Sequence, residues 1–378
     1  MNVKNSKLCR KEAMLLLNSL PKLGPISTNR LLDFFERDPL KIFHASQREL
    51  LSISGVGPAM VNSILDQDHG TWVQNELEII QKHSTSFITE EEIPSSLREI
   101  YDTPMGLYVK GTIPPGPYFA IVGTRLPSLY AQKVCSKIST DLALAGFCVV
   151  SGMARGIDSI AHQSALDVKG KTIAFLGSGM DIVYPPENLG LYQRIASEGA
   201  VITEFPFKRK ADRRTFPMRN RLVSGISSGL LVVESGSSGG SLITARFAAE
   251  QGRTVFAIPG RVDQPCSQGC HQLIREGAIL ITNANEIIED LKPSLTQTIL
   301  PLSESRQAEN PKNKINSDPI VSKNEKIILN LLELDGAMAV EQMCSICELT
   351  IQEISVSLSL LELSNRVGKR HDGKYELN

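Results

Sequence analysis

A strongly basic stretch runs from Lys208 to Arg221. It holds seven lysines and arginines against one aspartate, in a chain whose 40 basic and 41 acidic residues otherwise balance. Phe205, Phe207 and Phe216 lie within or beside it. Basic side chains pair with phosphates, and an aromatic ring stacks on an unpaired base of any kind. The combination predicts a grip on single-stranded nucleic acid; a solvated charged face is the alternative.

Short glycine- and serine-rich segments form a second candidate site. Each follows an apolar run of strand length; the segments are Gly123-Thr124-Arg125, 151–158, 177–179 and 234–241. Backbone amides, hydroxyls and arginines at the carboxyl ends of strands form anion-binding surfaces. In open α/β sheets, ligands bind at this edge. The sequence therefore predicts one crevice to which Arg125 and Arg155 add positive charge, although glycine and serine also occur at such turns for steric reasons.

Other chemistries lack their signatures. The chain has no Gly-x-x-x-x-Gly-Lys-Ser/Thr loop, and no Gly-x-Gly-x-x-Gly follows the first apolar run, which disfavours ATP hydrolysis and nicotinamide chemistry. His162 has no evident acidic or thiol partner, so we expect a structural role for it. Cys266, Cys270 and His271 lie about seventy residues from the next pair of cysteines. A structural zinc site usually takes ligands from two adjacent pairs, so we expect no metal and no cofactor.

The cellular compartment follows from cysteine usage and hydropathy. The seven cysteines are odd in number and scattered, which is typical of a reducing compartment. No apolar run approaches the ~18–20 residues that span a bilayer. The amino terminus is polar and basic and lacks the apolar core of a signal peptide. We therefore expect a cytoplasmic protein without a membrane segment.

Hydrophobic patterning predicts the elements that position these residues. Five apolar, β-rich runs alternate with amphipathic stretches such as 128–145 and 241–251. The runs are Tyr118–Val122, Phe147–Val150, Thr172–Leu176, Leu230–Val233 and Val255–Ile258. Continuously apolar strands separated by helices predict a parallel sheet covered on both faces. We therefore expect residues 86–292 to form a doubly wound, Rossmann-like α/β domain.

Smaller domains are predicted on either side. In residues 1–85, apolar side chains recur at helical spacing, and Gly55-Val56-Gly57 forms a turn before a helix. This pattern is typical of a helix-hairpin-helix or SAM-like domain. Such a turn either binds a phosphate or only joins packed helices. Residues 293–322 have the polar, proline-containing composition of a linker. Residues 323–378 fit three helices and a hairpin around 371–373, a winged-helix pattern. Residues 301–378 hold 9 basic and 12 acidic side chains, so we expect protein contacts there rather than DNA binding.

An ordered series of motifs resembles the DprA/Smf family of bacterial DNA-processing proteins. The series covers about residues 95–290 and comprises Leu107-Tyr108-x-x-Gly111, Val122-Gly123-Thr124-Arg125, Ser151-Gly152-x-Ala154-Arg155-Gly156-Ile157-Asp158, Ala161-His162, Gly179-x-Asp181-x-x-Tyr184-Pro185, Phe216-Pro217-x-Arg219-Asn220-Arg221, Ser238-Gly239-Gly240-Ser241-x-x-Thr244-Ala245 and Pro259-Gly260. One departure is His271, which stands where the family usually has asparagine, so no contact is carried over there.

The resemblance implies a function. Proteins of this family bind incoming single-stranded DNA in natural transformation and load the recombinase RecA onto it, helping to displace single-strand-binding protein. They form homodimers through the sheet domain and have no established catalytic activity. Motifs and resemblance together predict a DNA-binding set of Gly123, Thr124, Arg125, Ser151, Gly152, Arg155, Lys208, Phe216, Arg219, Asn220, Arg221, Ser238, Gly239 and Ser241. The expected function is thus sequence-independent binding of single-stranded DNA without catalysis.

Two alternatives stay open at this point. The sheet domain also looks like Rossmann-type phosphoribohydrolases, which hydrolyse nucleotide–sugar bonds, with Glu204 and Glu234 as candidate carboxylates. Glu234 could equally be a buried partner of Arg125 or Arg221, which the sequence favours. The second alternative is an interaction scaffold in which the sheet domain only dimerises.

Overall fold

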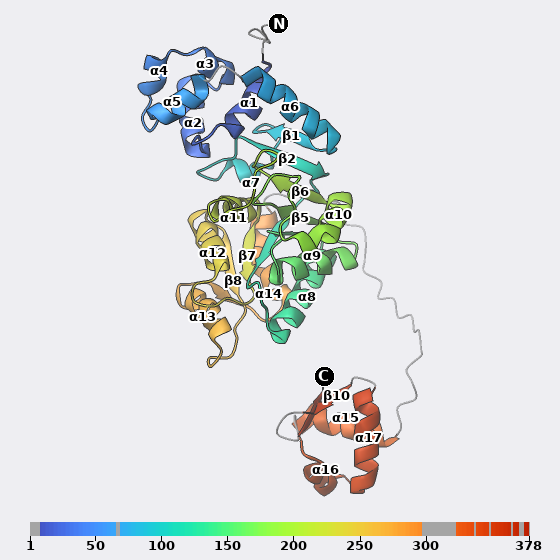
Figure 1. The fold of residues 1–378 in the computed structure, drawn as a ribbon. Coiled ribbons are helices and arrows are strands. Elements are labelled where there is room, and N and C mark those ends of the chain that lie inside the picture. The colour runs from blue at the N-terminus through green and yellow to red at the C-terminus, as the bar shows by residue number, and fades with distance from the viewer. Residues whose placement is uncertain are drawn as a thin grey trace. The chain divides into compact units, whose positions relative to one another are not determined.

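The computed structural model describes residues 8–65, 69–296, 323–335, 338–347, 349–363, 366–369 and 374–377. The chain divides into two compact units, 1–302 and 303–378. The first unit is built around one twisted sheet with helices on both faces (Figure 1). The second is a small helical unit with two short strands.

The sheet of the first unit has nine strands in the described residues. Their bounds are β1 Ser86–Thr89, β2 Gly106–Gly111, β3 Tyr118–Val122, β4 Cys148–Ser151, β5 Thr172–Phe175, β6 Ala200–Thr203, β7 Gly229–Val232, β8 Thr254–Ala257 and β9 Ile279–Leu280. The spatial order is β1-β2-β6-β5-β4-β3-β7-β8-β9. Strands β3 to β9 are parallel, whereas β2 pairs antiparallel with β6 and β1 antiparallel with β2.

The α/β class with a mostly parallel sheet is therefore confirmed. The five expected strands occur as β3, β4, β5, β7 and β8, each with bounds within one residue of the prediction. β1, β2, β6 and β9 have no counterpart among the predicted strands, and β1 and β2 add an antiparallel edge. β6 has four residues and β9 only two. Hydrophobic periodicity carries little signal over the two residues of β9. Length does not explain β6, because β4, β5, β7 and β8 also have four residues each.

Helices of the first unit cover both faces of this sheet (Figure 1). The bounds are α7 Ser95–Arg98, α8 Leu129–Leu144, α9 Ile157–Asp167, α10 Leu189–Glu198, α11 Thr215–Ile226, α12 Gly240–Glu250, α13 Gln268–Arg275 and α14 Ala284–Thr296. Successive strand side chains point to opposite faces. In β3, Phe119 and Ile121 pack with α8, α9 and α14, whereas Ala120 and Val122 pack with α7, α11 and α12.

Six further helices precede the sheet. They are α1 Arg10–Ser19, α2 Pro25–Phe34, α3 Pro39–His44, α4 Gln47–Leu51, α5 Pro58–Leu65 and α6 His69–Lys82. Their buried side chains share one core with Tyr108 of β2 and Ile195 of α10. Glu76 of α6 also accepts hydrogen bonds from the Tyr108 hydroxyl (2.9 Å) and the Phe207 amide (3.0 Å). These helices are therefore joined to the sheet through a continuous core.

The second unit packs three helices and a two-stranded sheet around its own core. The elements are α15 Lys323–Asp335, α16 Val340–Ile346, α17 Ile351–Leu363, β10 Val367–Lys369 and β11 Tyr375–Leu377. Ile328, Met343 and Leu358 lie in that core. The hairpin turn expected at 371–373, and residues 297–322 of the expected linker, lie outside the described residues; 293–296 belong to α14. No single described helix could span a bilayer, and α16 and α17 reach the required length only together, across a 119° bend.

Candidate nucleic-acid interface

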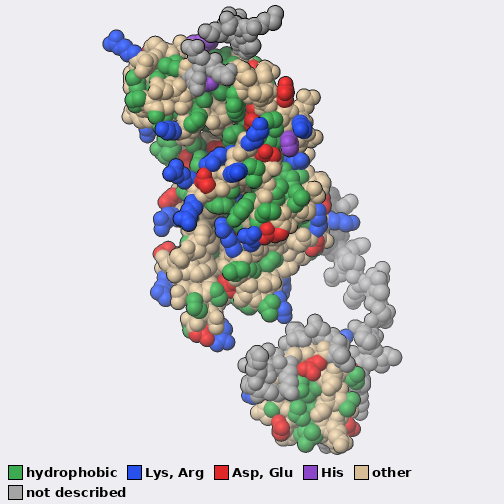
Figure 2. Space-filling view, viewed as in Figure 1, with side chains coloured by type: hydrophobic (Ala, Val, Ile, Leu, Met, Phe, Trp, Pro, Cys, Tyr) green, Lys and Arg blue, Asp and Glu red, His purple; other side chains and the backbone are tan. Residues whose placement is uncertain are grey.

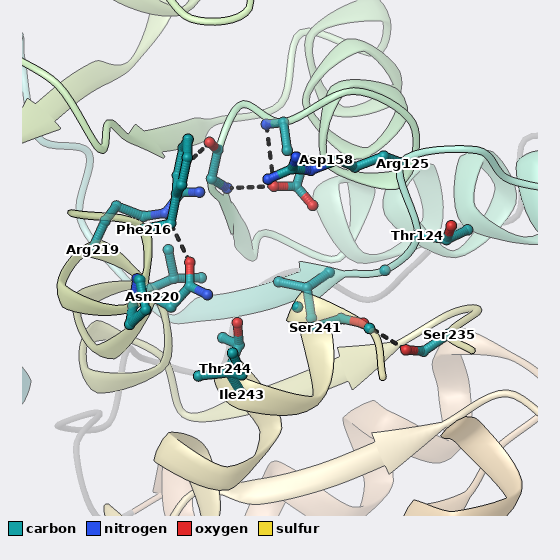
Figure 3. Close-up of a pocket in the computed structure, with 18 of the residues that line it drawn as sticks. Thr124, Arg125, Asp158, Phe216, Arg219, Asn220, Ser235, Ser241, Ile243 and Thr244 are labelled. Carbon is teal, nitrogen blue, oxygen red and sulfur yellow. Dashed lines mark hydrogen bonds between the residues drawn. The ribbon is translucent and has the colours of Figure 1, made fainter. Parts of the chain in front are cut away.

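The strand order reverses next to β3. The chain proceeds from β3 through β4 and β5 to β6 on one side and later returns through β7 and β8 on the other. Such a switch point opens a crevice at the carboxyl ends of the strands. A cleft of about 540 Å³ lies there, and its wall includes residues of the loops after β3, β4 and β7 and of α11 and α12 (Figure 3). Three of the four predicted segments thus meet in one cavity, whereas Gly177 of the segment 177–179 and Arg155 line an adjoining hollow instead.

Glycines let the loops approach one another around this cleft. A side chain at Gly152 would lie 2.4 Å from a guanidinium nitrogen of Arg219. Gly156 has a φ of +76°, and a β-carbon there would lie 2.4 Å from the carbonyl oxygen of Thr124. Only glycine fits at these two positions without strain. The loops after β3 and β4 therefore pack closely and bring Arg125 to the mouth of the cleft.

Helix α11 supplies the opposite wall. Phe216, Arg219 and Asn220 are spaced three and four residues apart, so they share one face of the helix, which lines the cleft (Figure 3). Arg221 follows Asn220 by about 100° of helical rotation and lies on another face. In the face of the molecule drawn in Figure 2, Lys and Arg side chains gather over the region of α11, with apolar side chains between them.

Arg125 is the cation best placed for a ligand. Its side chain is exposed, and its guanidinium lies 5.4 Å from the centre of the Phe216 ring. Arg213, also exposed, lines the same cleft. Neither arginine forms an ion pair with any carboxylate in the described part of the chain. Two positive charges therefore face the cleft without an internal counterion.

Arg219 has a different role. Its residue is only 5% exposed, and Nη1 donates to the carbonyls of Gly152 and Phe175, the second at 2.7 Å. Burial lowers the pKa of its guanidinium to about 10. The guanidinium lies 5.9 Å from the Phe216 ring, on which Arg125 also lies. Arg219 therefore fixes the ring and the loop after β4, and its charge reversal would disturb the fold as well as the cleft.

Asp158 lines the cleft but is absent from the predicted DNA-binding set. Its carboxylate accepts hydrogen bonds from the amides of Gly152 and Ala154, both at 3.2 Å. Burial raises its pKa, while the nearby Arg219 opposes the shift. It holds the loop after β4 in place. The predicted DNA-binding set also lacked further wall residues, namely Arg213, Pro217, Val223, Ile243 and Thr244. Of these, Arg213 lies in the predicted basic stretch, and Pro217 and Thr244 lie in the family motifs.

The structure brings most of the predicted set together in the cleft. Those that line it are Gly123, Thr124, Arg125, Gly152, Phe216, Arg219, Asn220, Gly239 and Ser241. Arg155 lines an adjoining hollow. Ser238 lines another cavity, by α12 and β9. Lys208 lines none of these, and its amide donates to Asp181. Ser151 is buried and donates to the Ile121 carbonyl at 2.6 Å.

Arg221 is the clearest correction. Its side chain is 3% exposed, forms a buried ion pair with Glu204 and contacts Asp102 at 3.2 Å. It cannot reach a ligand in the cleft. Phe205 and Phe207 are buried too, so of the three phenylalanines in the basic stretch only Phe216 is available for stacking. Helical rotation along α11, which composition does not reveal, separates Arg221 from Arg219 and Asn220.

The candidate carboxylates of the enzyme alternative lie elsewhere. Glu204 pairs with Arg221, and Glu234 accepts hydrogen bonds from the amide and hydroxyl of Ser128 at 2.9 and 2.7 Å. The expected pairing of Glu234 with Arg125 or Arg221 was wrong, because Glu234 instead caps the start of α8. Neither glutamate lines the cleft.

His162 and His271 also have structural partners. His162 is fully buried, and its Nδ1 lies 2.6 Å from the Thr172 hydroxyl. His271 Nε2 lies 2.9 Å from the carbonyl oxygen of Gly260. Among the residues described, no three His, Cys, Asp or Glu side chains are grouped to hold a metal ion.

Comparisons with known proteins identify what this chain is similar to. The family described as DNA recombination-mediator protein A matches residues 84–292. Protein Smf of Synechocystis is 33% identical over 94% of this chain and 95% of its own length. DNA processing protein DprA of Bacillus subtilis is 34% identical over 70% of this chain and 91% of its own.

Two solved structures share the fold. DNA processing protein A from Streptococcus pneumoniae superposes with a TM-score of 0.65 at 31% identity, covering 75% of this chain and 99% of that one. The protein from Helicobacter pylori, solved to describe its single-stranded DNA binding mode, has a TM-score of 0.51 at 31% identity, covering 55% and 97%.

Proposed function

Because this chain belongs to the DprA/Smf family of DNA recombination-mediator proteins, we propose that it binds single-stranded DNA in the cleft, without regard to sequence, and loads RecA onto that strand in natural transformation. The observation that carries the proposal is the exposed Arg125 guanidinium, which lies over the Phe216 ring and has no carboxylate partner in the described chain. The ring can stack on a base while Arg125 and Arg213 pair with phosphates.

The chemistry of the cleft supports binding without sequence preference. Its wall combines glycines, hydroxyls, two available arginines and one ring that a base can face. Backbone amides and guanidinium groups contact phosphates, and these contacts carry no sequence information. Every base has a face on which an aromatic ring can stack. The proposed ligand is therefore any unpaired DNA segment.

The remaining parts of the proposal concern partners and catalysis. We propose a cytoplasmic homodimer, formed through the sheet domain, that helps to displace single-strand-binding protein from DNA and delivers the DNA to RecA. We further propose that it is not an enzyme. The one carboxylate in the wall of the cleft, Asp158, is bound to two backbone amides. Incubation with nucleoside monophosphates tests this point, because release of free base by the purified protein would contradict it.

Charge reversal at Arg125 tests the cleft directly. Since Arg125 is exposed and lacks an ion pair, Arg125→Glu removes a phosphate contact and adds repulsion while the fold stays intact. We expect the affinity for fluorescent oligo-dT to fall more than tenfold in an anisotropy titration at low salt. Arg98→Glu, the same change at another exposed arginine, on α7 outside the cleft, is the matched control. Equal affinities of wild type and Arg125→Glu would refute the assignment.

A further inference from the structure

A small hollow adjoins the cleft and shares part of its wall. Arg125, Phe216 and Arg219 line both cavities, whereas Tyr184 and Arg155 line only the hollow. Its volume is about 10 Å³, which is room for one water molecule. A phosphate or a base enters only if a side chain at its rim moves.

The ring of Tyr184 extends the aromatic surface of the cleft. Its centre lies 5.7 Å from the centre of the Phe216 ring, with 47° between the planes. Tyr184 is 40% exposed. Proteins that bind single strands place aromatic rings along a basic groove so that successive bases stack on them. Tyr184 therefore offers a face to a second base, next to the one that Phe216 receives.

Arg155, at the same hollow, is held by an acidic side chain. Its Nε and Nη2 both donate to the Glu187 carboxylate, the Nη2–Oε2 distance being 3.1 Å. Arginine binds a phosphate with the same paired geometry. The hydrogen bond from Arg155 holds the pKa of Glu187 below its usual range, so this carboxylate is charged at neutral pH.

Asn188 ties the turn that bears Glu187 to the segment that bears Arg155. Its amide nitrogen donates to the Met153 carbonyl at 3.0 Å and to the Ser159 hydroxyl at 2.8 Å. Both acceptors lie in or beside the loop after β4, which carries Arg155. The turn that bears Glu187 is therefore tied to that loop, and the ion pair forms between two positioned segments.

We propose that Tyr184 and Arg155 form a second nucleotide subsite beside the cleft, and that Glu187 occupies its phosphate position in the DNA-free protein. The proposal rests on the proposed function. The side chains of Arg155 and Glu187 are 47% and 52% exposed, and ion pairs this exposed are weak. A phosphate of a strand already held at Arg125 can therefore displace the carboxylate. Glu187 is an internal competitor of DNA.

The variant Glu187→Gln tests this competition, because it frees Arg155 without removing it. We expect oligo-dT to bind up to about fivefold more tightly at low salt, given the usual strength of exposed ion pairs. The slope of log affinity against log salt should change little, because the same phosphate pairs with Arg155 in the bound state of both proteins. When Arg155 is already replaced by alanine, we expect Glu187→Gln to give no increase in affinity for oligo-dT. The control Glu36→Gln removes the same negative charge and frees Lys41 from an exposed ion pair outside the hollow, and we expect no increase in affinity.

The stacking half of the proposal is tested at Tyr184. Loss of one stacked base weakens binding about fivefold to 150-fold, so we expect Tyr184→Ala to fall in this range. Tyr184→Phe recovers most of that loss, because the ring is what stacks. Unchanged or weaker binding by Glu187→Gln, or a gain that persists without Arg155, would overturn the proposal while the Arg125 result still stands. If wild type binds no oligo-dT at all, both proposals fall.

Discussion

Arg125 and Arg219 both lie against the Phe216 ring, but their roles differ. Arg125 is exposed, whereas Arg219 is buried and bound to backbone carbonyls of two neighbouring strand ends. The same residue type is thus a ligand contact in one place and a structural tie in the other. Burial and hydrogen bonding decide between these roles, and neither can be read from a motif. We therefore expect stability measurements to separate the two arginines.

Substitution by alanine makes that separation measurable. In Arg219→Ala, the buried carbonyls of Gly152 and Phe175 lose their donor, and each such loss costs about 1–3 kcal/mol. We expect the free energy of unfolding in urea to fall by about 2–4 kcal/mol. The same change at the exposed Arg125 should cost less than about 0.5 kcal/mol. Equal stability of the two variants would mean that the Arg219 hydrogen bonds contribute nothing to the fold.

The buried pair of Arg221 and Glu204 leads to a second prediction at this scale. Removal of one partner leaves an uncompensated buried charge, so Arg221→Met should lower the free energy of unfolding by about 3–5 kcal/mol. Adding Glu204→Leu should restore much of that loss, because no charge then stays buried. Urea unfolding of the single and double variants measures both values. A single variant as stable as wild type would contradict the structural role assigned here.

At the scale of elements, the sequence was most informative where uniformly apolar runs of strand length alternate with amphipathic stretches. The strands β3, β4, β5, β7 and β8 and the position of the crevice could be predicted, because buried parallel strands are continuously apolar and their carboxyl ends share one edge. The different roles of Arg219 and Arg221 in α11 could not be predicted, because they depend on the direction in which each residue points from the helix axis. The basic stretch reads as a single patch, yet Arg219 faces the cleft and Arg221 faces Glu204.

The contact between α9 and β5 should give stability a particular pH dependence. Burial lowers the pKa of His162 to about 3, whereas the unfolded chain has a value near 6.5. The unfolded state therefore binds more protons below pH 6.5, and this contribution to stability, complete above pH 6.5, is lost as pH falls towards 3. Between pH 7.5 and 5.5 we expect a loss of about 1 kcal/mol from this group. His162→Asn should remove that part of the pH dependence in urea titrations; an unchanged dependence would contradict the prediction.

At the scale of the whole molecule, charge is distributed unequally between the two units. The cleft and all of its unpaired arginines lie in the first unit, whereas residues 301–378 hold 12 acidic against 9 basic side chains. A surface with excess negative charge repels a polyanion. The second unit therefore has no electrostatic reason to hold DNA, and its contact with protein stays a prediction.

Truncation tests this division. A chain that ends at residue 302 retains the sheet, the cleft and the helices that cover it. We expect it to bind oligo-dT with an affinity within about twofold of the full chain, and with an unchanged salt slope, since the slope reports the number of phosphates neutralised. Anisotropy titrations over a salt series compare the two proteins, and Arg125→Glu in the shorter chain shows whether binding still uses the cleft. A large loss of affinity on truncation, or a smaller slope, would show that the second unit contacts DNA despite its negative charge.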